Sequence, residues 1–358
     1  MNRVCDNLIR RCKPIAEWPD TDQRQWRQAV ACSGVFDAGT RSEYSPASLS
    51  KLAKGYGRWL TWLEITGQLE PDIPAANRIT LERARQYVKH LADIGITPAG
   101  LANRLRELLD AGLTFDPKRD WAWLRQAVQR AKCAIVPARD KASKVVDADR
   151  LLDLGMRLMA ESDKAGALVR QSTAFRDGLI IAFLTLCPLR RRNLAMIQIG
   201  THLIKAADGK GYLLEFDGHQ TKTKRPIRLP WPAALEDALK EWMNIHRPRL
   251  VEHVGRWNKP AGNSLWLSHD GSPLTPTSIY FAICKRTKQA FGHSVNPHLF
   301  RDCAVTTFGI VDPANIHAAA PLLGHTSLKT TEAHYQQAQM HHSVKRYQDT
   351  IMQARKAP

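Results

Sequence analysis

Residues 184–194 read LTLCPLRRRNL, which places three consecutive arginines directly after an apolar run. The apolar residues belong to a segment, Thr173–Leu186, whose composition predicts a buried helix. The run is shorter than the stretch of about 18 apolar residues that a membrane span requires. We therefore expect a core helix that holds Arg190 rigidly at its end. A cation there also complements the helix dipole, so this residue alone does not define a site.

The periodicity changes beyond these arginines. Short alternating segments predict three strands, at Thr201–Lys205, Gly211–Phe216 and Arg225–Leu229. Apolar residues at helical spacing then predict helices at Ala233–His246, Thr277–Phe291, Pro297–Ile310, Pro313–Leu323 and Lys329–Gln339. With a helix beginning at Asp147, residues 147–358 are expected to form a mostly helical domain with a small three-stranded antiparallel sheet.

The first part of the chain predicts a second, all-helical domain. Ser45 and Pro46 are typical of a helix start, and further helices follow Thr80 and Thr97. A fourth helix covers Trp121–Cys133. We expect a four-helix unit at residues 41–133 with a basic surface. Residues 1–40 show only a weak period around Trp26, so we expect an N-terminal extension of unknown role.

Residues 134–146, AIVPARDKASKVV, have the composition of a linker between the two domains. The segment has no helical period, and its basic residues are Arg139, Lys141 and Lys144. Such a linker can follow a phosphate backbone or serve as a solvated tether, and the sequence leaves both interpretations open.

Charge favours a polyanionic partner. The chain has 52 Lys and Arg against 34 Asp and Glu, a formal net charge of +18, although charge alone leaves nucleic acid, anionic membrane and solubility open. Met1–Lys13 lacks the apolar core of a secretory signal, which favours a cytoplasmic location. The seven cysteines include no CxxC pair, and neither they nor His341 and His342 have metal-ligand spacing. We expect reduced thiols and no metal or cofactor.

Six polar side chains follow one another in an order that suits the cleavage of a phosphodiester. Arginines can each bind two phosphate oxygens, a lysine can protonate the leaving oxygen, histidines can donate to the phosphate, and a tyrosine can attack it. In chain order these candidates are Arg190, Lys222, His298, Arg301, His325 and Tyr335. The residues alone leave alternatives open, since Arg191 and Arg192 compete with Arg190, and Lys224 and Arg225 compete with Lys222.

Two of these candidates share a predicted helix. His298 and Arg301 are three residues apart after Pro297, so both side chains should project from one helix face. Tyr335 follows His325 by ten residues. A phenol has an ordinary pKa near 10, so Tyr335 would need cationic neighbours to become a nucleophile at neutral pH.

These segments resemble the ordered Arg, Lys, His-x-x-Arg, His and Tyr boxes of the tyrosine recombinases, the phage integrase family of site-specific DNA recombinases. The resemblance spans roughly residues 45–345. It implies a phosphate pocket built from the five basic residues, with Tyr335 as the nucleophile that forms a 3′-phosphotyrosyl intermediate without metal or ATP. In this family the hairpin lysine is placed by counting back eight residues from a position equivalent to Pro230, which selects Lys222 as the general acid.

The sequence departs from the family pattern at a few positions. Pro188 and Asn193 stand where a glycine and an acidic residue are common, and Asp302 stands where a histidine is common. The interval from His325 to Tyr335 is one residue longer than the commonest spacing. Because no catalytic residue type is missing, we interpret these differences as variation within the family.

The resemblance also implies partners. The helical unit is similar to a SAM-like core-binding domain, which with the catalytic domain closes a C-shaped clamp on double-stranded DNA. A homotetramer on two recombination sites of a mobile element is expected, with accessory DNA-bending or directionality proteins as further partners. The tail, with Val344, Tyr347 and Ile351 on one helical face, would dock on a neighbouring protomer or on its own domain.

Two other functions compete with recombination. A type IB topoisomerase uses much the same pocket but reseals the original strand. A non-catalytic DNA-binding module descended from a recombinase is disfavoured by the complete set of six residue types.

Overall fold

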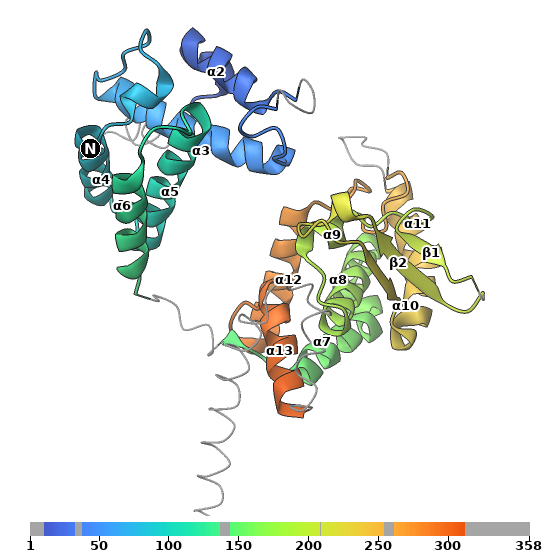
Figure 1. The fold of residues 1–358 in the computed structure, drawn as a ribbon. Helices are drawn as coiled ribbons and strands as arrows, with labels where there is room; N and C mark the ends of the chain where they lie inside the picture. Colours follow the sequence, from blue (N-terminus) through green and yellow to red (C-terminus); the bar gives the residue numbers. More distant parts are fainter. Residues whose placement is uncertain (1–10, 33–37, 137–143, 208, 254–260, 312–358) are drawn as a thin grey trace, which may run out of the picture. The chain divides into compact units, whose positions relative to one another are not determined.

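The computed structural model describes residues 11–32, 38–136, 144–207, 209–253 and 261–311 (Figure 1). The chain divides into two compact units, Met1–Arg139 and Asp140–Pro358, and the division falls within the segment that the sequence predicts to be a linker. Across the described ranges, no helix combines the length and the apolar character needed to cross a membrane.

The N-terminal unit is built from helices packed around one apolar core. In the part of it that the structure describes, the α-helices are α2 (Asp20–Val30), α3 (Pro46–Ile65), α4 (Leu81–Asp93), α5 (Pro98–Phe115) and α6 (Ala122–Cys133). Sequence signals at three helix starts have the expected effect, because the side chains of Ser45, Thr80 and Thr97 each accept a hydrogen bond from a backbone N–H of the first turn.

Helix α2 lies in a region that the sequence assigned to an extension outside the domain. In the structure Trp18 and Trp26 are buried in the same core as Tyr56 and Trp59, and the ring centroids of Trp18 and Tyr56 are 5.0 Å apart. The domain boundary expected at residue 41 therefore differs from the structure, where the unit already includes Trp18. The physical reason is burial of two large aromatic side chains, which stabilises α2 despite its polar sequence.

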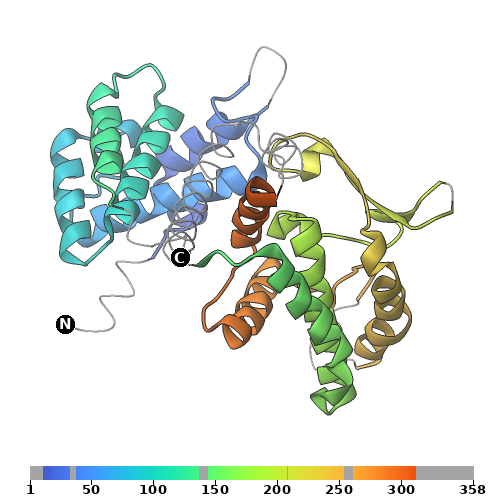
Figure 2. The same ribbon diagram turned by 90° about the horizontal axis from the view of Figure 1, so that it is seen from below.

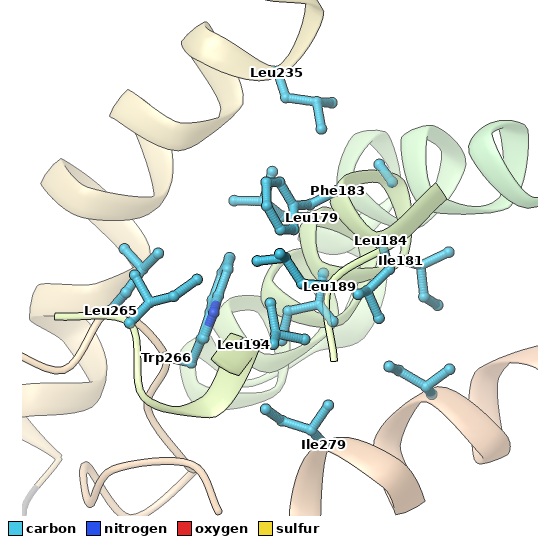
Figure 3. Close-up of a cluster of buried hydrophobic side chains, with 14 of the residues drawn as sticks. Leu179, Ile181, Phe183, Leu184, Leu189, Leu194, Leu235, Leu265, Trp266 and Ile279 are labelled. Carbon is cyan, nitrogen blue, oxygen red and sulfur yellow. The ribbon is translucent and has the colours of Figure 1, made fainter. Parts of the chain in front are cut away.

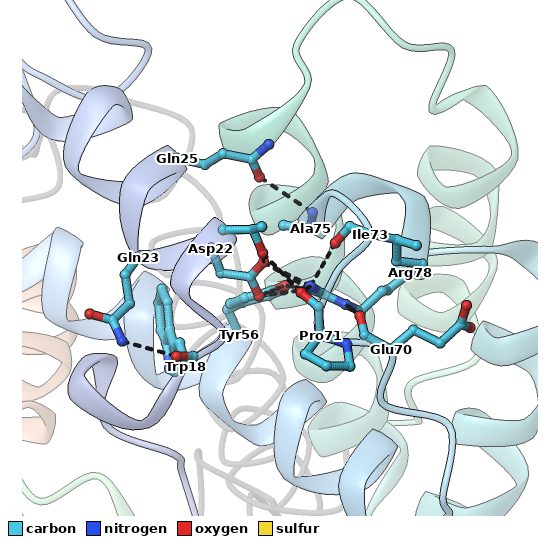
Figure 4. A network of polar contacts seen from close by, with 11 residues as sticks. Trp18, Asp22, Gln23, Gln25, Tyr56, Glu70, Pro71, Ile73, Ala75 and Arg78 are labelled. Atoms are coloured by element: carbon cyan, nitrogen blue, oxygen red, sulfur yellow. Dashed lines mark hydrogen bonds and ion pairs between the residues drawn. The ribbon is translucent and has the colours of Figure 1, made fainter.

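A buried ion pair fastens α2 to the rest of this unit (Figure 4). The Asp22 carboxylate accepts hydrogen bonds from Arg78 at 2.7 and 2.8 Å and from the Tyr56 hydroxyl at 2.8 Å. Arg78 also donates to the carbonyl oxygens of Glu70, Pro71 and Ile73. Both charged side chains are fully buried, so the network satisfies groups that would otherwise be costly to remove from water.

The C-terminal unit is mostly helical with one small sheet, which confirms the predicted fold class. Its described α-helices are α7 (Ala148–Ala160), α8 (Leu168–Leu186), α9 (Arg191–Ala195), α10 (Glu236–Glu241), α11 (Arg247–Glu252), α12 (Pro276–Phe291) and α13 (Leu299–Val311). Helix α8 is the centre of the core, where Leu179, Phe183 and Leu184 lie among Leu194, Trp266 and other apolar side chains (Figure 3).

The three predicted strands are present as an antiparallel sheet in the order β1 (Leu203–Lys205), β2 (Tyr212–Phe216) and β3 (Ile227–Pro230). The buried strand residues Leu203, Leu214 and Phe216 belong to the core around α8. Directly after β3, Trp231 stacks on Phe183 with ring centroids 4.5 Å apart. This contact fixes the end of the sheet against α8.

Several helix boundaries differ from those predicted. Helix α8 begins at Leu168 rather than near Thr173, and the helix expected at Ala233–His246 continues through a π-helical turn, Trp242–His246, into α11. Helix α13 packs beside α7 and α8 (Figures 1 and 2). The helices predicted at Pro313–Leu323 and Lys329–Gln339 lie outside the described residues.

Candidate active site

Arg190 follows α8 in a short connection rather than ending the helix itself. Helix α8 ends at Leu186, and Arg190 has extended backbone angles at the start of α9. The expectation that Arg190 ends the helix is therefore wrong. The cause is Pro188, which lacks an N–H donor and disfavours helical geometry at Cys187. Arg190 is thus presented by a tight turn in front of α9.

Arg301 reaches back from α13 to the same turn. Its Nη1 atom donates a hydrogen bond of 2.7 Å to the carbonyl oxygen of Pro188, and the side chain is 5% exposed. The pKa of Arg301 is lowered to about 10, chiefly by burial and in addition by the positive charge of Arg190, while the Asp302 carboxylate acts in the opposite direction. The charges of Arg190 and Arg301 therefore lie close together where water solvates them poorly. A bound anion would offset the electrostatic free energy of this arrangement.

His298 lies one turn before Arg301, at the start of α13. The side-chain oxygen of Asn296 accepts hydrogen bonds from the backbone N–H groups of His298, at 2.9 Å, and Leu299, at 3.2 Å. The helix begins at Leu299, two residues later than predicted, after a turn in which the Leu299 N–H also donates to the backbone carbonyl oxygen of Asn296. The side-chain oxygen of Asn296 caps this turn. The cap orders the backbone that carries both His298 and Arg301.

Lys222 lies in the connection between β2 and β3, as predicted. The preceding Thr221 is buried, and its hydroxyl donates to the carbonyl oxygens of Gly218, at 3.1 Å, and Arg225, at 2.7 Å. One residue earlier, the carbonyl oxygen of Gln220 accepts from Asn193 of α9 at 3.4 Å. The Lys222 loop, residues 217–226, is therefore tied to the helix that follows Arg190.

One pocket of about 430 Å³ brings together the predicted residues that the structure describes. Arg190, Lys222, His298 and Arg301 all line it, although they come from three separate parts of the chain. The other lining residues are Leu189, Arg191, Tyr280, Asn296 and Pro297, so no acidic side chain is among them. Lys224, the competing lysine, is exposed and does not line the pocket.

Five lining residues are not among the site residues predicted from the sequence, and four of them are polar or mark a helix start. The sequence indicates Arg191 only as an alternative to Arg190. In the structure its guanidinium carbon lies over the ring of Tyr280, 5.5 Å from the ring centroid. Tyr280 gave no signal, because it fits the helical pattern of α12. The Asn296–Pro297 pair is a helix-start signature and could have been recognised.

The remaining two predicted residues, His325 and Tyr335, lie outside the described residues. So does the tail with Val344, Tyr347 and Ile351. Within the described ranges, no group of three or more His, Cys, Asp and Glu side chains is arranged to hold a metal ion.

The C-terminal unit thus combines a mostly helical fold and a small sheet with a pocket whose lining has basic side chains and no acidic one. The model of the phage integrase family matches residues 155–342, more than half of the chain, and the chain belongs to that family. The match includes the positions of His325 and Tyr335. No curated protein sequence matches the chain.

The solved structures that are similar to this fold include two DNA complexes of one recombinase. One is the XerH site-specific recombinase bound to difH substrate in a pre-cleavage complex, with a TM-score of 0.53 and 17% identity, over 81% of this chain and 77% of that chain. The other is the post-cleavage complex of XerH with palindromic difH substrate, with a TM-score of 0.51 and 16% identity, over 95% and 99% of the two chains. At these identities the similarity establishes the fold.

Proposed function

We propose that this protein is a site-specific DNA recombinase that cleaves and rejoins strands through a 3′-phosphotyrosyl intermediate. The observation that carries the proposal is the convergence of Arg190, Lys222, His298 and Arg301 on one pocket without an acidic lining residue. Membership of the phage integrase family and the DNA complexes of the similar structures support it.

In the proposed reaction the two arginines neutralise the scissile phosphate. Arg190 and Arg301 bind its non-bridging oxygens, and the Pro188 carbonyl fixes the orientation of the Arg301 guanidinium. His298 and His325 donate hydrogen bonds to the same phosphate. Preorganised donors of this kind act without reorganisation at the moment of reaction, which is the main source of their effect.

Bond breakage then needs a nucleophile and a proton donor. Tyr335 releases its phenolic proton to solvent and its oxygen attacks phosphorus, the bond to the 5′ oxygen breaks, and the Lys222 ammonium gives that oxygen a proton. Rejoining reverses these steps, as a 5′-hydroxyl of a partner strand attacks the phosphotyrosyl link and releases the phenol. A homotetramer on two DNA sites would bring the partner strands together.

A nicked suicide substrate tests the nucleophile, because loss of a short 5′ fragment traps the covalent adduct. We expect the wild-type protein to form the adduct and Tyr335→Phe to bind the DNA without forming it. Tyr280→Phe is the matched control, since Tyr280 is a tyrosine of the described pocket and keeps its ring as phenylalanine. An adduct with Tyr335→Phe that disappears in Tyr280→Phe would reassign the nucleophile.

A substrate with sulfur at the 5′ bridging position tests the general acid. Sulfur leaves as a thiolate and needs no proton, so Lys222→Ala should cleave this substrate far faster than ordinary DNA. Lys224→Ala should show no such difference. Rescue of Lys224→Ala rather than Lys222→Ala would overturn the assignment.

A further inference from the structure

The pocket carries more positive charge than one scissile phosphate requires. Its lining includes four side chains that are cationic at neutral pH, Arg190, Arg191, Lys222 and Arg301, and no carboxylate. A single phosphodiester carries one negative charge. In a DNA strand the next charged phosphate follows along the backbone, so a surplus of cations beside one phosphate suits its neighbour.

Arg190 and Arg191 are adjacent in the chain but face different surroundings. Arg190 is half-buried, and its charge acts on Arg301. Arg191 is exposed and lies against Tyr280 of α12. Successive residues at a helix start project in different directions, so the two guanidinium groups are not directed at the same oxygen atoms.

The contact with Tyr280 restricts where the Arg191 charge can lie. The guanidinium carbon is 5.5 Å from the ring centroid, within the range of a cation–π interaction. Such a contact uses the ring face and consumes no N–H donor of the guanidinium. Arg191 thus remains a fork of donors, held at the wall of the pocket by a half-buried aromatic ring.

We propose that Arg191, positioned by Tyr280, binds the phosphate adjacent to the scissile phosphate in the cleaved strand. This inference rests on the proposed function and adds a second phosphate subsite to it. The ligand is the pair of non-bridging oxygens of a flanking phosphodiester. By binding this flanking phosphate, Arg191 sets the register of the DNA strand, so that the scissile phosphate lies between Arg190 and Arg301.

Neutral phosphates in the substrate test this subsite. A methylphosphonate replaces one non-bridging oxygen with a methyl group and removes the charge, and it is placed in turn at the phosphate on either side of the scissile one. On unmodified nicked DNA, Arg191→Ala should slow adduct formation roughly 10- to 100-fold, as expected for the loss of a charge-assisted contact. Arg192→Ala is the matched control, because Arg192 is exposed, adjacent in sequence and absent from the pocket lining.

Measuring Arg191→Ala on methylphosphonate DNA shows whether Arg191 binds the flanking phosphate. At one of the two flanking positions the methylphosphonate should slow the wild-type protein as much as Arg191→Ala does, and should slow Arg191→Ala no further. Additive effects at both positions would overturn the subsite. Because the wild-type protein must still form the adduct on unmodified DNA, failure of the subsite is distinguishable from failure of the proposed function.

Variants at Tyr280 test the positioning role. Tyr280→Phe keeps the ring that Arg191 contacts and should retain the wild-type dependence on the flanking phosphate, whereas Tyr280→Leu removes the ring and should reproduce part of the Arg191→Ala defect, with the same dependence on the flanking phosphate. A Tyr280→Leu defect of equal size on charged and neutral flanking phosphates would overturn this role. Thermal unfolding of each variant separates these effects from loss of the fold.

Discussion

The guanidinium of Arg301 and the carbonyl oxygen of Pro188 form a 2.7 Å hydrogen bond that joins helix α13 to the turn presenting Arg190. This bond makes the position of one arginine depend on the backbone that carries the other. It also gives Pro188 a definite place in the site, since the proline both ends α8 and directs its carbonyl toward α13. The proline therefore supports the pocket, although it is not one of the lining residues.

Arg301→Lys should slow cleavage strongly while preserving the fold. A lysine keeps the charge but has one ammonium group, which cannot donate to the Pro188 carbonyl and to two phosphate oxygens in the planar geometry of a guanidinium. We expect adduct formation to fall about 100-fold or more, by analogy with the removal of one preorganised donor. The measurement is the single-turnover rate on nicked DNA, and a rate within about threefold of wild type would contradict the bidentate role.

The same site should make free protein responsive to anions. The lowered pKa of Arg301, about 10, indicates that its charge is costly while the pocket holds no anion, and that it is still protonated at neutral pH. Added sulfate should therefore raise the melting temperature of the wild-type protein more than that of Arg301→Met. Equal shifts in the two proteins would show that the anion acts elsewhere.

The cleavage rate should depend on the backbone conformation of the Lys222 loop and should not depend on the side chain of Lys224. Lys224 has a φ of 54°, a left-handed conformation that glycine adopts without strain, so Lys224→Gly should leave the cleavage rate unchanged. A Cβ atom at Gly218 would lie 2.6 Å from the carbonyl oxygen of Lys224, so Gly218→Ala must displace the loop. We expect cleavage to slow by roughly 10- to 100-fold, because misplacing a reacting group by about 1 Å has effects of this size. Cleavage by Gly218→Ala at the wild-type rate would show that this loop does not position the proton donor.

Features with strong local signals were predictable from the sequence. The capped helix start at Ser45, the apolar periods of the long helices and the three strands all depend on neighbouring residues, and the structure contains each of them. Helix α2 had no such signal. Its stability depends on Asp22, whose partners Tyr56 and Arg78 are distant in the sequence, and on the burial of Trp26 in a core that includes Trp59 and Leu105. A local pattern does not reveal such contacts.

The candidate site likewise has some features that the sequence predicts and others that it does not. The resemblance to the tyrosine recombinases, carried by residue order and type, selects Arg190, Lys222, His298 and Arg301, and all four line one pocket in the structure. The bond from Arg301 to Pro188 spans 113 residues of sequence and could not be predicted. Tyr280 was missed for a related reason, since an aromatic residue on an amphipathic helix usually serves packing rather than a site.

Cys303 should resist alkylation in the folded protein. The thiol is 1% exposed, its sulfur accepts a hydrogen bond from the Val146 backbone at 3.5 Å, and burial raises its pKa to about 11. Because the thiolate is the reactive form, a raised pKa leaves little of it at pH 8. Iodoacetamide should modify the exposed Cys32 and Cys133 first, as followed by mass spectrometry, and Cys303 only after unfolding. Modification of Cys303 at the same rate as Cys133 would contradict its burial.

The sign of the pH effect on stability follows from the same pKa. Since the folded-state value lies above the ordinary value, the folded protein retains a proton between about pH 9 and 11 that the unfolded chain releases. The contribution of this thiol to the free energy of unfolding should therefore fall as the pH rises through that window. Comparison with Cys303→Ala at pH 8.5 and 10.5 isolates the contribution, which should be larger at the lower pH.

The Asp22–Arg78 pair should be the most sensitive point of the N-terminal unit, because its two charges are fully buried. Asp22→Asn leaves the Arg78 charge without a counter-ion and should lower the free energy of unfolding by about 3–5 kcal/mol. Asp20→Asn, in the exposed first turn of the same helix, should cost less than about 1 kcal/mol and serves as the control. Urea unfolding followed by tryptophan fluorescence reports on both units, since both cores contain tryptophans, and a transition that shifts in Asp22→Asn but not in Asp20→Asn is assigned to this unit. A double variant, Asp22→Leu with Arg78→Met, should be more stable than Asp22→Asn alone, because it removes both buried charges together. If the double variant is instead the less stable one, the three backbone carbonyls that Arg78 satisfies, rather than its ion pair, are the main reason for its burial.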